Sequence, residues 1–97
     1  MYVMEGVRMQ TDCAIIMDTL NNPMAAVVLV DSGTFQSSSN REAARVALRN
    51  VDILQGLAIV MATQNGDTIQ MNGDSNLVSQ LSRQDWMGWN WMTLTVD

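Results

Sequence analysis

The sequence contains no histidine and no lysine, and each absence removes a class of chemistry. Without histidine the chain has neither a Ser-His-Asp nor a Cys-His nucleophile, and it has no imidazole metal ligand. Without lysine it cannot form a Schiff base. The catalytic groups that remain in numbers are carboxylates, hydroxyls and guanidiniums.

Cysteine is almost absent as well. The single Cys13 excludes an internal disulfide and a cysteine-rich zinc site. Because Cys13 precedes the apolar segment 14–17, we predict that it is a small buried hydrophobic residue. We expect no metal site and no cofactor.

Positive charge is scarce, and long apolar runs are missing. The net charge of −5, with five arginines as the only basic residues, argues against nucleic acid as a partner. No apolar run reaches the ~18 residues that a membrane span needs, and residues 1–10 lack the pattern of a secretory signal. We therefore expect a soluble, cytoplasmic protein without a membrane partner.

The chain is long enough for one domain, which we place over residues 1–97. Two apolar runs, 14–20 and 24–30, flank Asn21-Asn22-Pro23 and predict a hairpin whose strands are buried on both faces. Alternation over 2–9 suggests a weaker strand. A second hairpin is predicted over 57–71 around Asn65-Gly66, and a last strand closes the chain within 89–96.

The main helix is predicted over residues 40–54. Ser39 and Glu42 form a capping box, Ala43, Ala47, Val51 and Leu54 share one face, and Gly56 offers a left-handed stop. A shorter helix is expected from Ser75 to Leu81. The predicted fold class is α+β, with a mostly antiparallel sheet in the order β-β-β-α-β-β-α-β and one main helix packed on one face.

One helix covers one face of a sheet, whereas the predicted strands are apolar on both faces. A second copy of the chain is the simplest cover for the other face. We therefore predict that the chain is its own partner, as a homodimer or a higher oligomer.

Three arginines follow one face of the main helix at i, i+4 and i+8: Arg41, Arg45 and Arg49. Three forked donors in a row suit a phosphate or a carboxylate, so a small anionic ligand is one interpretation. An ordinary solvated helix face is the other, and the sequence leaves both open.

Three of the chain's five aromatic residues lie close together near its end: Trp86, Trp89 and Trp91. Spacings of three and two cannot all face one way on a single regular element. At least one ring is expected to project from the main core toward a subunit interface or a ligand, and the alternative is that the rings close a small core.

The apolar run 25–30 ends in Asp31-Ser32-Gly33-Thr34, which resembles the active-site turn of retropepsin-like aspartic peptidases. Residues 61–67 of this chain are similar to the flap hairpin of that family, and residues 87–92 are similar to its apolar-glycine segment behind the active site. The resemblance implies a homodimer in which two copies of Asp31 share a proton and activate water. The alternative is that Asp31 only ends the strand and has a structural role.

The segment 82–91 resembles a second family. Ser82, Asp85 and the apolar residues that follow are similar to the closing signature of small phage proteins that sequester nucleotide signals in Thoeris anti-defence. That resemblance implies an oligomeric, non-catalytic protein.

These observations favour a non-enzymatic, homo-oligomeric binding protein. It is expected to contact a protein or a small ligand through the tryptophan-rich segment. The alternatives are the aspartic peptidase that uses Asp31 and an accessory domain that serves stability alone.

Overall fold

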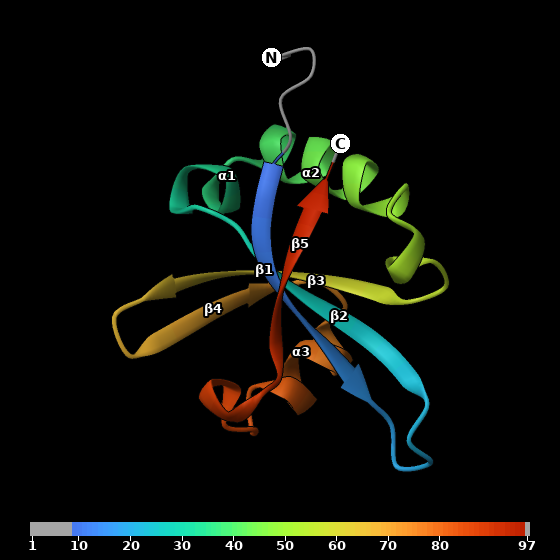
Figure 1. Ribbon diagram of the computed structural model, residues 1–97. Coiled ribbons are helices and arrows are strands. Elements are labelled where there is room, and N and C mark those ends of the chain that lie inside the picture. The colour runs from blue at the N-terminus through green and yellow to red at the C-terminus, as the bar shows by residue number, and fades with distance from the viewer. Residues whose placement is uncertain (1–8, 97) are drawn as a thin grey trace.

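A computed structural model describes residues 9–96 as one five-stranded sheet with helices on both faces (Figure 1). The strand order is β4-β3-β2-β1-β5. The strands are β1 (Met9–Met17), β2 (Pro23–Leu29), β3 (Ala58–Asn65), β4 (Thr68–Asn72) and β5 (Trp91–Val96). The α+β class is confirmed. The strand predicted over 2–9 lies outside the described residues except for Met9, which begins β1.

The sheet is mixed, so the prediction of a mostly antiparallel sheet is wrong. β1 pairs antiparallel with β2 and β5, and β3 with β4, but the central strands β2 and β3 run parallel. The chain leaves the end of β2 into a helical layer and re-enters the sheet in the same direction. Such a crossover produces a parallel pair, whereas a short turn produces an antiparallel one.

Both predicted hairpins are present. The β1–β2 turn is organised by Asp18, whose Oδ1 accepts hydrogen bonds from the backbone N–H groups of Leu20 and Asn22, both at 2.9 Å. Asn21 lies between them with a φ of 64°, a left-handed conformation that asparagine tolerates better than most residues. The turn residues thus fix where β1 ends and β2 begins.

The first helical layer consists of α1 (Ser32–Gln36), α2 (Ser38–Arg49) and the 3₁₀ helix η1 (Asp52–Leu54). The predicted helix starts earlier than expected, because the side chain of Ser37, rather than Ser39, accepts the capping bond from Asn40 N–H at 3.3 Å. It also ends earlier, at Arg49. Gly56 does adopt a φ of 80°, but it follows η1 instead of terminating α2.

Helices α1 and α2 lie on one side of the sheet, and α3 (Ser75–Leu81) with the 3₁₀ helix η2 (Trp86–Gly88) lies on the other (Figure 1). The predicted main helix does pack on one face, and the short helix predicted over 75–81 covers the other face. The cap of α3 is Asp74, whose Oδ1 accepts from Leu77 N–H at 3.0 Å, and not Ser75. The short α3 carries only three apolar residues, so its sequence gave little indication that it covers a face.

Each face of the sheet has its own core. The core beneath α2 contains Cys13, Ala26, Val28, Leu48, Leu54 and Leu94. The core beneath α3 contains Ala14, Ile16, Ala25, Val27, Val60, Ala62 and Leu81. The predicted burial of both strand faces is thus satisfied within one chain, so a second copy is not needed to cover the second face.

Among the helices of residues 9–96, none is both long and apolar enough to cross a membrane.

Candidate functional site

Two of the three tryptophans close the second core. The rings of Trp89 and Trp91 pack against it with their centroids 5.9 Å apart at 44°. The Trp89 indole N–H donates to Gln84 Oε1, and the Trp91 indole N–H donates to the carbonyl of Trp86, both at 3.0 Å. Both polar tips are therefore occupied within the chain, and neither is free to bind a ligand.

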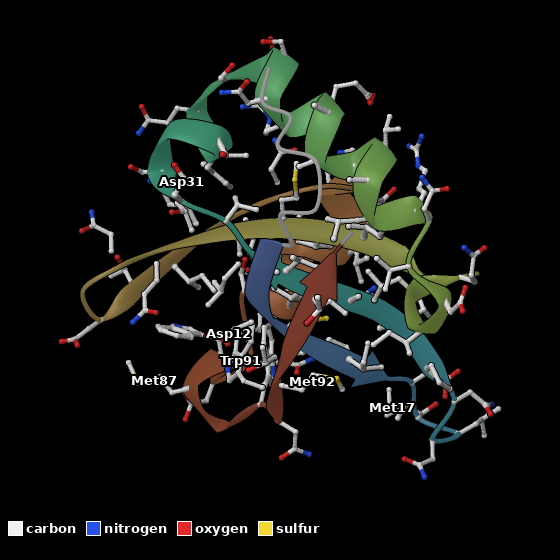
Figure 2. The ribbon with its side chains drawn as sticks, turned by 45° about the horizontal axis from the view of Figure 1, so that its top comes forward. Asp12, Met17, Asp31, Met87, Trp91 and Met92 are labelled. Carbon is white, nitrogen blue, oxygen red and sulfur yellow. The ribbon has the colours of Figure 1, made fainter. Side chains whose placement is uncertain are left out.

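Among the described residues, Trp86 forms no aromatic pair with either of the other two rings. Its side chain is half-buried, and among residues 9–96 it joins neither core cluster. The next residue, Met87, is 55% exposed at the η2 turn (Figure 2). This turn therefore presents apolar atoms to solvent immediately before β5 begins.

The Ser82 and Asp85 side chains act locally. Ser82 Oγ donates to the carbonyl of Val78 at 2.7 Å, and Asp85 Oδ1 accepts from Met87 N–H at 3.2 Å. These bonds end α3 and start η2. The residues that carry the resemblance to the nucleotide-sequestering proteins thus have structural roles here, and the oligomeric, non-catalytic protein that the resemblance implies stays a prediction.

β5 is an edge strand. Its inner side pairs with β1 from Met9–Val96 to Ala14–Trp91 without a register shift, and no strand formed by residues 9–96 lies on its outer side. Residues 90–96 carry no charge, and Met92 is 42% exposed (Figure 2). Natural edge strands usually carry lysine, proline or a bulge that prevents pairing, and β5 has none of these.

The three predicted arginines do not form one site. Arg41 Nη1 donates to the carbonyl of Phe35 at 2.5 Å. Arg45 reaches across the layer to the sheet, where Nη1 donates to the carbonyl of Ile59 at 2.8 Å and Nη2 to the carbonyl and the side-chain Oδ1 of Asn72 at 3.1 and 3.0 Å. Arg49 is exposed. Two of the three guanidiniums are thus engaged with backbone carbonyls, which does not favour a shared anion site.

Asp31 lies at the start of α1, where its backbone carbonyl accepts from Phe35 N–H at 2.9 Å. Thr34 Oγ1 donates to Asp31 Oδ1 at 2.5 Å, and this hydrogen bond lowers the pKa of the carboxyl below its usual value. A bond to the charged form keeps the group ionised at neutral pH. The tetrad 31–34, which resembles a peptidase turn, here forms the first turn of a helix.

An open hollow of about 400 Å³ lies beside Asp31. It is lined by Thr11, Asp12, Leu29, Val30, Asp31 and Thr93. The sequence interpretation missed Asp12 and Thr93, because they become neighbours only through the pairing of β1 with β5. Residues 9–96 contain no group of three or more histidine, cysteine, aspartate or glutamate side chains arranged to hold a metal ion.

Asp31→Asn should remove stability at neutral pH but not in acid. The folded pKa of Asp31 lies below the ordinary value of 3.8, so the carboxylate stabilises the fold above that value and loses its contribution as the pH falls through the folded pKa. Urea unfolding should separate wild type from the variant at pH 7, and the two should converge in acid, once the pH has fallen below the folded pKa of Asp31.

Thr34→Val provides the matched control, since it removes the donor and keeps the carboxylate; it should reproduce the loss at pH 7. An equal difference at neutral and at acid pH would contradict this role for Asp31.

Comparison of the wild type with Asp31→Asn also tests the peptidase interpretation. Cleavage of unfolded casein near pH 5 by the wild type and not by Asp31→Asn would establish it. We expect no cleavage by either.

No protein-family model, no curated protein and no solved structure matches this chain.

Proposed function

We propose that the chain is a non-enzymatic, homo-oligomeric binding protein. Its contact surface combines β5 with the preceding turn, residues 85–90, which we call the tryptophan-rich turn. The observation that carries the proposal is the uncharged edge of β5, which no other strand of the described residues 9–96 covers and on which Met92 is exposed. An unprotected edge strand is a ready template for another chain.

The exposed methionines support the same surface. Met92 and Met87 are 42% and 55% exposed, and they lie on β5 and on the tryptophan-rich turn. Methionine is flexible and polarisable, and it is frequent at surfaces that bind protein partners. Trp89 and Trp91 hold the turn against the second core, so the surface is supported by packed rings.

The chemistry of the side chains favours a non-enzymatic role. The chain has no histidine and no lysine, and its only cysteine is fully buried. Burial raises the pKa of the Cys13 thiol to about 11, so it is not a nucleophile at neutral pH. The proposal needs only surface contacts, which this composition provides.

Light scattering behind a sizing column should give about twice the chain mass of 10.7 kDa at micromolar concentration. Met92→Asp should raise the dimer dissociation constant by at least ~tenfold, because it places a carboxylate in the contact surface of a chain that already carries a charge of −5.

Leu20→Asp is the control. Leu20 is 79% exposed in the β1–β2 turn, and its replacement changes the net charge equally. The dimer should survive in this variant. A wild type that is monomeric up to high micromolar concentration, or equal dissociation of the two variants, would refute the proposal.

A further inference from the structure

We infer, on the basis of the proposed function, that the partner of β5 is β5 of a second copy. The two strands pair antiparallel about a twofold axis perpendicular to the sheet, and they join two five-stranded sheets into one. The hydrogen-bonding pattern of an edge strand specifies a strand as its occupant, since only extended backbone satisfies alternating N–H and C=O groups. Self-pairing is the closed arrangement that a single kind of chain achieves with one interface.

Charge favours self-pairing at β5 over the other edge, β4. An antiparallel pair of β4 strands would bring Asp67, before the strand, close to Asp74 of the other copy at both ends. Like charges in such positions are destabilising. β5 spans Trp91–Val96, between Asn90 and Asp97 in the sequence, so its flanks carry one carboxylate where those of β4 carry two.

The two faces of β5 restrict the register. Trp91 pairs with Ala14 of the second core, so Trp91, Thr93 and Thr95 share that face, whereas Met92 and Leu94 lie on the face of the first core. A twofold axis perpendicular to the sheet keeps each face continuous. Residues opposite each other must then belong to the same face. This condition is met only when the twofold axis passes through a residue position, and not when it passes between two residues.

Because β5 has six residues, two positions of the axis, at residue 93 and at residue 94, lie nearest its middle and give the longest overlap of the two strands. An axis at position 93 places Thr93 opposite itself and Met92 opposite the partner's Leu94. An axis at position 94 places Thr93 opposite the partner's Thr95. Both bring Met92, which is 42% exposed in one chain, into the seam between the sheets. Cross-strand threonine pairs are among the favourable pairs of antiparallel sheets.

Engineered cysteines test the pairing. Thr93→Cys should form an interchain disulfide on oxidation with diamide if the axis lies at position 93. The double variant Thr93→Cys, Thr95→Cys should do so if it lies at position 94. Residues directly opposite in an antiparallel pair have Cβ atoms about 4.5–5.5 Å apart, which small backbone shifts bring within disulfide reach. Thr93 and Thr95 are exposed, and the native Cys13 is fully buried and does not compete.

Gln70→Cys, at an exposed position of the other edge strand, is the matched control. One of the two β5 variants should crosslink roughly tenfold faster than Gln70→Cys, because only the geometry of a paired seam aligns the two sulfurs. Reduced proteins should keep the wild-type urea midpoint, which verifies that the variants are folded.

The outcomes separate this inference from the proposed function. A dimer by light scattering with no crosslink in either β5 variant would overturn β5 self-pairing and leave the homo-oligomer in place. Faster crosslinking of Gln70→Cys would move the seam to β4 and overturn the inference as well. A monomer in every measurement would overturn both proposals together.

Discussion

Replacing Arg45 by alanine should lower the free energy of unfolding by about 3 kcal/mol, the upper end of the ~1.5–3 kcal/mol that one hydrogen bond to a charged group contributes, because it leaves partly buried acceptors unsatisfied. The guanidinium joins α2 to the carbonyl of Ile59 on β3 and to two oxygens of Asn72 on β4. Those oxygens are partly shielded from water, so a truncated side chain leaves them without a good partner. Urea unfolding at pH 7 measures the loss.

Arg49→Ala is the control for Arg45→Ala. Arg49 lies one turn further along α2 and is exposed, so its removal should change the unfolding free energy by less than about 0.5 kcal/mol. Arg45→Lys should recover only part of the loss, because one ammonium cannot reproduce a planar fork. Equal effects of the two alanine variants would mean that the bonds of Arg45 to the sheet contribute nothing measurable.

Local sequence signals predicted the strands and turns well. The run from Ala14 and the run ending at Val30 are too apolar for a half-exposed sheet, and Asn21-Asn22-Pro23 between them permits only a tight connection. Both signals act over a few residues, so they are readable without the fold. The hairpin and the burial of Cys13 followed from them. The main helix followed from another local signal, the capping box and the apolar face of residues 43–54.

The relation between distant elements was not readable in the same way. Whether β3 lies parallel to β2 depends on the path of the chain through α1 and α2, and no residue of either strand encodes that direction. α3 covers the second face with Leu77, Val78 and the buried Leu81, a set too small to distinguish a covering helix from an exposed one. The prediction of a second copy rested in part on not recognising that α3 covers this face.

The candidate site shows the same limit. Arg45 has the spacing of a solvated stripe, and its acceptors on β3 and β4 lie 14 and 27 residues away in sequence. The edge position of β5 is likewise a property of the whole sheet order. The sequence located the tryptophan-rich segment as the region of interest, but only the topology shows that no other strand of residues 9–96 covers the outer side of β5.

Trp91→Ala should be the second most damaging of these substitutions, with a loss of ~3 kcal/mol, near the low end for a large aromatic residue because the ring is only partly buried. The ring packs on the second core beside Trp89, opposite the fully buried Ala14. Its removal opens a gap over that core and frees the carbonyl of Trp86. Trp91→Phe keeps an aromatic ring but lacks the indole N–H, so it should lose about 1 kcal/mol.

The Trp91 measurement also decides whether this ring supports the fold or the contact between copies. If the ring acts within one chain, the loss should be the same at all protein concentrations and should persist in the monomeric Met92→Asp background, because unfolding of a monomer does not depend on concentration. Trp86→Ala, which keeps the backbone carbonyl that accepts from Trp91, should cost less. A loss that disappears in the Met92→Asp background would instead assign Trp91 to the interface between copies.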